Sequence, residues 1–139
     1  MNIIFLDVED VKMLHAEQIE AFGGSHGVRD EGSLASAVNQ AQAGFGDDYL
    51  HEFPFGMGAA YAFHIAQNQP FIDGNKRAAL AAALVFLDIN GYEAPGPEPR
   101  LYEAMIAIAE KSQTKADLQA LFSSICSKKS DLSTRTQDY

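Results

Sequence analysis

The sequence of 139 residues contains a single cysteine, Cys126, which excludes an intramolecular disulfide and a cysteine-rich metal site. Such a chain fits a reducing compartment, and we expect a cytoplasmic protein. Long hydrophobic runs are also missing. The longest, residues 78–87, is half alanine and about half of the roughly 20 residues that a membrane-spanning helix needs. The N-terminus lacks the basic start of a secretory signal. We therefore expect neither a membrane protein nor a secreted one.

Basic residues are scarce as well. The chain has 19 Asp and Glu against 10 Lys and Arg, which gives a formal net charge of −9. Because nucleic-acid binding relies on basic side chains that neutralise phosphates, we expect no direct nucleic-acid partner. The hydrophobic share of 47% fits one soluble domain with a real core. The composition turns polar after Cys126, which predicts a domain over residues 1–126 and a disordered tail over residues 127–139.

The spacing of apolar residues is mostly helical, which predicts an all-α bundle of about six helices with at most one short β hairpin or strand pair. Residues 3–5 and 92–94 are the candidate strands. Residues 55–67, rich in small side chains, predict a buried helix, and residues 75–90 predict the strongest helix of the chain. Predicted helix ends are marked by Asp7, Asp30, the pair Thr114 and Asp117, and Gly91.

The segment with the most chemical information is residues 69–77, Gln-Pro-Phe-Ile-Asp-Gly-Asn-Lys-Arg. It places a glycine and several donors at the start of a long helix, where free backbone N–H groups and the helix dipole favour an anion. Gly74 leaves room for a phosphate, Asn75 offers an amide donor, and Lys76 and Arg77 add positive charge. These residues predict a phosphate-binding site.

Asp73 would repel a phosphate unless a divalent cation lies between them. Magnesium is typically held by one or two carboxylates together with phosphate oxygens, so Asp73 is the candidate ligand for Mg²⁺. A simpler interpretation also fits: Asp-Gly-Asn before a helix is typical of a turn with an N-cap, and Lys76 and Arg77 would then be solvated.

This segment resembles the motif of the Fic/Doc family, His-Pro-Phe-x-Asp/Glu-Gly-Asn-x-Arg, at every defined position except the first. The resemblance extends over about residues 5–126 and favours the death-on-curing (Doc) branch of small toxins. The stretches that carry it are Phe22-Gly23-Gly24, Gly27-Val28-Arg29-Asp30, Ala59-Ala60-Tyr61, Asn75-Lys76-Arg77, Leu84-Val85-Phe86-Leu87 and Asn90-Gly91.

The resemblance implies that Asp73 holds Mg²⁺, that Asn75 and Arg77 hold the phosphates of ATP or another nucleoside triphosphate, and that the helix N-terminus forms an anion hole. Doc toxins transfer the terminal phosphoryl group to a threonine of elongation factor Tu and stop translation. Lys76 stands where nucleotidyl-transferring members have a second glycine, which favours phosphoryl transfer. AMP transfer, the reaction of most Fic proteins, is the alternative.

Gln69 occupies the position of the family's catalytic histidine. An amide cannot accept a proton near neutral pH, so the role of general base is vacant. His64 is five residues away and would point in another direction along a helix, while His15, His26 and His51 are scattered singly. Gln69 fits an engineered or otherwise inactivated toxin, which we favour because the other site residues would have no purpose in a long-decayed site. A natural pseudoenzyme that binds nucleotide or antitoxin without catalysis is the alternative.

Some Fic proteins carry their own inhibitory Ser/Thr-x-x-x-Glu helix, but no Ser or Thr of this chain has Glu four residues later. The resemblance therefore implies a separate cognate antitoxin. Such antitoxins fold on binding into an apolar groove, so we expect an exposed hydrophobic groove between helices. Arg29 and Asp30 have two interpretations, a place near the site or a helix cap beside a solvated arginine.

Overall fold

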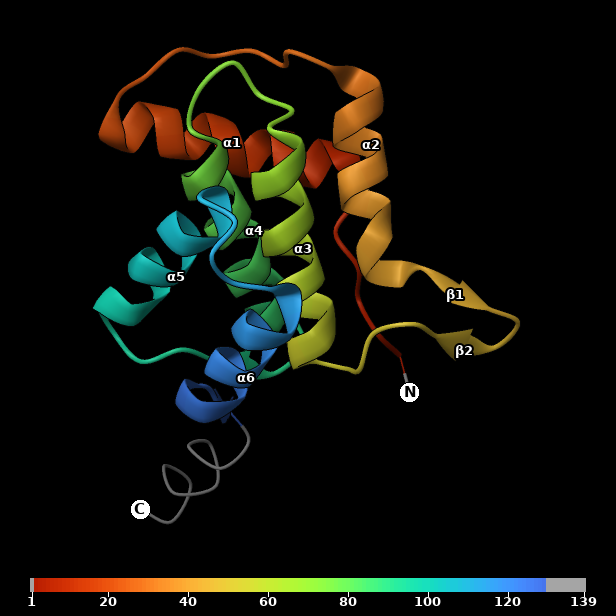
Figure 1. Ribbon diagram of the computed structural model, residues 1–139. Helices are drawn as coiled ribbons and strands as arrows, with labels where there is room; N and C mark the ends of the chain where they lie inside the picture. Colours follow the sequence, from red (N-terminus) through yellow and green to blue (C-terminus); the bar gives the residue numbers. More distant parts are fainter. Residues whose placement is uncertain (1, 130–139) are drawn as a thin grey trace, which may run out of the picture.

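The computed structural model describes residues 2–129, and this range contains six α-helices (Figure 1). A single 3-10 turn, η1 (Gln40–Gln42), follows the second helix. The all-α prediction of about six helices is confirmed. The helices are α1 (Val8–Phe22), α2 (Glu31–Asn39), α3 (Phe55–Asn68), α4 (Asn75–Ile89), α5 (Pro99–Ala109) and α6 (Lys115–Ile125).

The predicted caps explain where several helices begin. The Asp7 side chain accepts from the Asp10 backbone N–H in a capping box at the start of α1, and Asp30 accepts from Ser33 at the start of α2. Thr114 forms the predicted capping box with Asp117 before α6. Local hydrogen bonding is enough to fix these boundaries, because each cap joins residues three positions apart.

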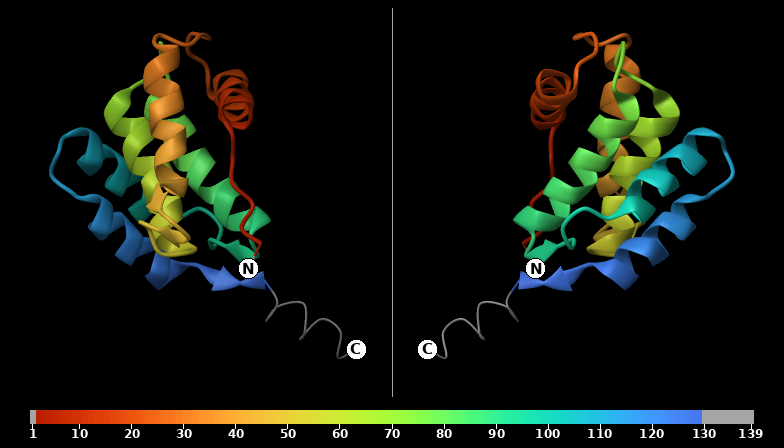
Figure 2. Two further views of the ribbon diagram at one scale, coloured as in Figure 1. Left: turned by 90° about the vertical axis from the view of Figure 1, so that its right-hand side faces the viewer. Right: turned by 90° about the vertical axis from the view of Figure 1, so that its left-hand side faces the viewer.

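Two short antiparallel strand pairs occur in residues 2–129, one more than predicted. β1 (Gly44–Phe45) pairs with β2 (Asp48–Tyr49) as a hairpin. β3 (Tyr92–Glu93) pairs with β4 (Ser127–Lys128), and Figure 2 shows the two beside the start of the chain. The sequence places residues 127 and 128 in the predicted tail, yet they pair with β3, because strand pairing uses backbone groups and tolerates polar side chains. The remainder of the predicted tail, residues 130–139, lies outside the described residues.

The other candidate strand, residues 3–5, is wrong: this segment runs alongside α4 but is not a strand, and it has no strand partner in the described part of the chain. The Asn90 side chain takes that role. Its Oδ1 accepts from the Ile4 backbone N–H at 2.9 Å, and its Nδ2 donates to the Ile4 carbonyl at 2.8 Å. One amide side chain thus satisfies the backbone groups that a neighbouring strand would otherwise bond.

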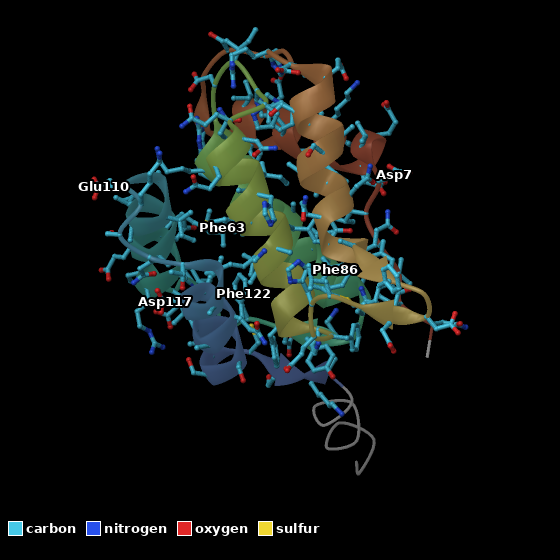
Figure 3. The ribbon with its side chains drawn as sticks, turned by 45° about the vertical axis from the view of Figure 1, so that its right-hand side comes forward. Asp7, Phe63, Phe86, Glu110, Asp117 and Phe122 are labelled. Carbon is cyan, nitrogen blue, oxygen red and sulfur yellow. The ribbon has the colours of Figure 1, made fainter. Side chains whose placement is uncertain are left out.

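Helix α3 lies at the centre and contacts α2, α4, α5 and α6 (Figure 1). Most of its residues are buried, as the sequence predicts, and most of the buried ones are glycine or alanine, which lets neighbouring helices pack closely. Around it, Phe86 of α4 and Phe122 of α6 are fully buried (Figure 3). This packing fixes the C-terminal end of α3 beside the N-terminal end of α4, with residues 69–74 between them. We call residues 69–74 the motif loop.

None of the helices in residues 2–129 has the length and apolar character needed to cross a lipid bilayer.

Candidate functional site

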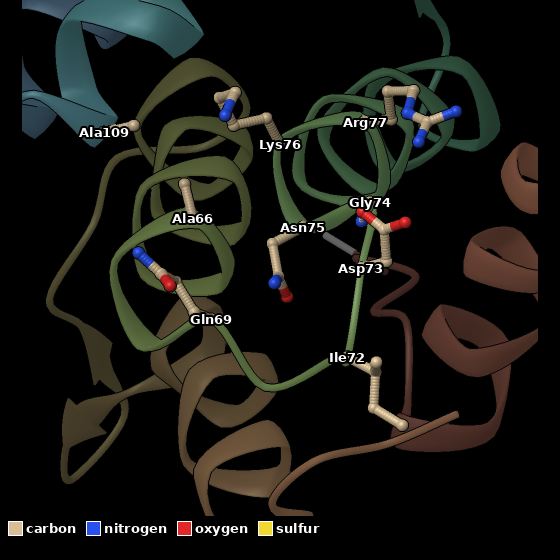
Figure 4. A pocket seen from close by; sticks show the side chains of 9 residues that line it. All are labelled: Ala66, Gln69, Ile72, Asp73, Gly74, Asn75, Lys76, Arg77 and Ala109. Atoms are coloured by element: carbon tan, nitrogen blue, oxygen red, sulfur yellow. Dashed lines mark hydrogen bonds between the residues drawn. The ribbon is translucent and has the colours of Figure 1, made fainter. Parts of the chain in front are cut away.

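A cavity of about 280 Å³ opens where α3 ends and α4 begins (Figure 4). The structure brings all six residues of the predicted site together in it, and adds apolar walls that the sequence did not indicate. One of these walls comes from α5, far along the chain. The lining residues are Ala66, Gln69, Ile72, Asp73, Gly74, Asn75, Lys76, Arg77 and Ala109.

The N-terminus of α4 forms the floor of the cavity. Gly74 is its N-cap residue, with φ 72° in the left-handed region that favours glycine, and it offers no side-chain cap. A Cβ at Gly74 would also come within 3.0 Å of the Ile19 side chain. The first-turn N–H groups of a helix have no partner inside the helix, so this end is a ready site for an anion.

Asp73 lies at the mouth of the cavity and is exposed. Its Oδ2 accepts from the Ser25 backbone N–H at 3.1 Å and its Oδ1 from the Gly74 N–H at 2.8 Å. These two bonds, with the nearby charge of Arg77, hold the pKa of the Asp73 carboxyl below its usual value. The backbone at Gly24 lies close to this carboxylate, because a Cβ on Gly24 would be only 2.7 Å from Asp73 Oδ2.

The site fits a magnesium ion that is shared with a phosphate. Asp73 supplies one ionised, exposed carboxylate, and magnesium usually combines one or two carboxylates with phosphate oxygens and water. No group of three or more His, Cys, Asp or Glu side chains in residues 2–129 is placed to hold a metal. The described residues therefore do not form a metal site from protein ligands alone.

The two cations stand on different sides of α4. Lys76 is exposed and points to the side of Ala66 and Ala109, whereas Arg77 points toward the end of α1 (Figure 4). Arg77 Nη1 donates to the Gly23 carbonyl at 3.1 Å, which fixes its guanidinium group at the rim. The solvated-lysine interpretation fits the exposure of Lys76, and the same exposure leaves it accessible to a phosphate.

Asn75 has a structural task that the sequence did not reveal. Its Oδ1 accepts from the Phe71 N–H at 2.9 Å, and its Nδ2 donates to the Phe71 carbonyl at 3.0 Å. The side chain therefore holds the motif loop closed. One N–H of the amide is left over for a ligand, so phosphate binding by Asn75 stays a prediction.

Gln69 ends α3 in the left-handed conformation, with φ 47° and ψ 56°, and its exposed side chain lines the cavity. The neighbouring Arg29 is not simply solvated. Its Nε donates to the Gln69 carbonyl at 3.0 Å, and its Nη2 donates to the carbonyls of Asn68 and Gln69. Asp30 caps α2 instead. The cap interpretation is thus confirmed for Asp30, whereas Arg29 lies near the site and is bonded to the end of α3.

The sequence treated His15 as a packed residue, and it is buried, but it also supports the motif loop. Its Nε2 donates to the Asp73 carbonyl at 2.7 Å, and its ring stacks on Phe71 with centroids 3.8 Å apart. The one available signal was its place between Val11 and Ile19 on the buried face of α1. His64 does not line the cavity and contacts Lys115 instead, as expected for a residue that does not replace the missing base.

Comparisons with known proteins find a family model and relatives that match this chain. The model of the Fic/DOC family matches residues 5–87, which include the whole motif loop. The chain is 46% identical over 90 residues to "Toxin Doc" of Mycolicibacterium smegmatis, covering 64% of this chain and 66% of that protein. It is 33% identical over 85 residues to "Protein kinase doc" of Escherichia phage P1, covering 61% and 67%. The chain spans about two thirds of the length of these relatives.

Proposed function

The chain belongs to the Fic/DOC family, and on that premise we propose that it is a Doc-type toxin whose reaction moves the terminal phosphoryl group of ATP, or another nucleoside triphosphate, to a protein hydroxyl. The observation that carries the proposal is the cavity at the start of α4, where a helix N-terminus, two cations and an ionised carboxylate meet. The name of the phage relative, a protein kinase, supports this reaction.

Each group at the site has a proposed task. The free N–H groups of α4, with Lys76 and Arg77, bind the phosphate oxygens and stabilise the charge that develops on them. Asp73 is the protein ligand for Mg²⁺. When bound, the metal ion would offset the phosphate charge and polarise the transferred group. Gln69 lines the cavity where a substrate hydroxyl would have to lose its proton.

We propose that phosphoryl transfer by this chain is slow because Gln69 replaces the general base. A positioned general base typically contributes about 10²- to 10⁴-fold in rate, and an amide supplies none of it. Positioning and charge stabilisation dominate phosphoryl transfer, so the remaining site retains nucleotide binding and a small residual rate. The target proposed from the family resemblance is elongation factor Tu, whose modification would stop translation.

Restoring the histidine tests the proposal. We expect Gln69→His to arrest bacterial growth on induction and to raise ATP-dependent modification of elongation factor Tu by about 10²- to 10⁴-fold. Gln69→Ala is the matched control and should do neither, because it changes the same position without adding a base. Normal growth with Gln69→His, together with unmodified elongation factor Tu, would contradict the proposal.

The same experiment separates the alternatives. Mass spectrometry distinguishes a phosphoryl from an adenylyl group on the target. An adenylyl group would show that the reaction is AMP transfer and not phosphoryl transfer. Gln69 itself favours a second candidate function, a module that binds nucleotide or antitoxin without catalysis. That function would be indicated if the Gln69→His chain bound nucleotide and magnesium but modified nothing.

An apolar groove of about 390 Å³ between α1, α4 and α5 is our proposed docking surface for the antitoxin. Two large side chains at its rim are strongly exposed, Phe22 at 69% and Tyr102 at 60%. An amphipathic helix could cover such a groove with its apolar face. The lining residues are Gln18, Phe22, Arg77, Leu80, Ala81, Leu84 and Tyr102, so Arg77 borders both this groove and the phosphate cavity.

A further inference from the structure

Three consecutive carbonyls at the end of α3 are bonded by one short segment that precedes α2. The Arg29 guanidinium donates to the carbonyls of Asn68 and Gln69. The next carbonyl, that of Pro70, accepts from the backbone N–H of Arg29 at 2.7 Å and of Asp30 at 3.1 Å. The backbone on either side of position 69 is thus held from 40 residues away in the sequence.

The end of α3 has no cation of its own beside its last carbonyls. The carbonyls of a last helical turn have no partner inside the helix and carry partial negative charge, which a cation normally offsets. Gln69 also adopts a left-handed conformation that non-glycine residues rarely take, and such a conformation persists only where the surroundings fix it.

The phosphate end of the motif loop is held by other residues. The Ile72 N–H donates to the Gly27 carbonyl at 3.0 Å, and His15 binds the Asp73 carbonyl. The Asn75 side chain closes the loop on Phe71. None of these bonds involves Arg29. Loss of the guanidinium group would therefore remove its bonds to the Asn68 and Gln69 carbonyls, while the Pro70 carbonyl kept its backbone partners and the start of α4 kept its place.

We propose that Arg29 is a positioning residue, which fixes the backbone at position 69 so that the side chain there meets the substrate hydroxyl. This inference rests on the proposed function, because it assigns Arg29 to the proton-accepting side of that reaction. A planar guanidinium group suits the task, since it bridges two carbonyl oxygens at once, which the single ammonium of lysine does less well.

The test compares Arg29→Ala and Arg29→Lys in the Gln69→His chain, with Arg100→Ala as the matched control. Arg100 is an exposed cation on α5, paired with Glu98 and absent from the cavity lining. We expect Arg29→Ala to lower kcat by about 10²-fold, the typical effect of a displacement of about 1 Å, with KM for the nucleotide changed by less than about twofold. Arg29→Lys should lie in between, and Arg100→Ala should resemble the parent.

Chemical rescue adds a readout that general destabilisation would not give. Millimolar guanidinium chloride should restore part of kcat to Arg29→Ala, whereas urea and sodium chloride at equal concentration should not. An unchanged kcat in Arg29→Ala would overturn the inference. So would an equal loss in nucleotide binding, because Arg29 would then support the whole site rather than position 69.

A second measurement keeps the two proposals separate. If the Gln69→His chain is inactive, the proposed function fails, but nuclear magnetic resonance still tests Arg29 in the chain with Gln69. We expect Arg29→Ala to shift the amide signal of Gln69 and to change its N–H to Hα coupling, which reports φ, while the amides of Lys76 and Arg77 stay in place. An unchanged coupling at Gln69 would overturn the inference.

Discussion

At the scale of single residues, the site is divided between side chains that face the cavity and side chains that hold its backbone. Asp73, Lys76 and Arg77 were predicted from nine contiguous positions and line the cavity together. His15 and Arg29 have partners 58 and 40 residues away, and sequence spacing gave no sign of their contacts. Long-range hydrogen bonds leave no local pattern, which is why these two supports needed the structure.

The assignment of magnesium to Asp73 gives a prediction at this scale. Asp73→Asn removes the charge and keeps one of the two oxygens that accept from the Ser25 and Gly74 N–H groups, so we expect nucleotide binding to lose its dependence on Mg²⁺, with at least about a tenfold lower affinity in its presence. Isothermal titration calorimetry with and without Mg²⁺ measures this. Asp47→Asn, in the exposed turn between β1 and β2, is the matched control.

The pH dependence of the same binding follows from the lowered pKa of Asp73. A carboxyl with a depressed pKa stays ionised through the pH range in which an ordinary aspartate titrates, and it loses its charge only at lower pH. We therefore expect the magnesium effect to persist from pH 7 to pH 5. Persistence of that effect in Asp73→Asn would show that another group binds the metal.

At the scale of the helices, the contact between α3 and α6 contains a cluster of titratable groups outside the cavity. Lys115, the first residue of α6, lies with Nζ 3.0 Å from His64 Nε2 and 5.7 Å from the centre of the Phe63 ring. Burial, then the charges of Lys115 and His51, lower the pKa of His64 to about 4. The imidazole is thus neutral at pH 7 and accepts a hydrogen bond from the ammonium group.

This cluster predicts that acid weakens the contact between α3 and α6. The pKa of His64 is near 6.5 in the unfolded chain and about 4 in the folded one, so its contribution is complete above pH 6.5 and is lost as the pH falls toward 4. Allowing for solvent screening of a half-exposed ring, we expect the free energy of unfolding to drop by about 1–2 kcal/mol. Urea unfolding at pH 7 and pH 4.5 measures the drop.

Two variants show whether the drop belongs to His64. His64→Gln keeps an acceptor for Lys115 but does not titrate, so its stability should change less between the two pH values. His26→Gln, at an exposed residue bonded to Glu20, should retain the full dependence. Equal pH dependence in His64→Gln and the parent would assign the effect to other groups.

At the scale of the whole molecule, packing around α3 places two surfaces side by side. The phosphate cavity lies between the ends of α3 and α4, and the apolar groove lies on the neighbouring face between α1, α4 and α5. Arg77 borders both. A protein bound in the groove would therefore contact Arg77, which we assign to phosphate binding. An antitoxin bound there would act on the phosphate site directly.

The groove predicts which surface substitution weakens the antitoxin. Tyr102→Ala removes an exposed aromatic side chain from the rim without disturbing the core, and tyrosine is enriched among the few interface residues whose loss costs more than about 2 kcal/mol. We expect at least about a fivefold weaker complex with an antitoxin that neutralises the Gln69→His chain in co-expression. Ile106→Ala, also exposed on α5 but outside the groove lining, is the control. Equal affinities for both variants would place the antitoxin elsewhere.

The sequence by itself determined the helices, several of their caps and the chemistry of residues 69–77, because periodicity, capping and motif order act over a few neighbouring positions. Only the tertiary structure decided that Arg29 and His15 support the motif loop, that Ala109 closes the cavity, and that residues after α6 pair with β3. These features join segments that are distant in the chain. Their positions follow from how the helices pack around α3, and packing depends on side chains from all of them at once.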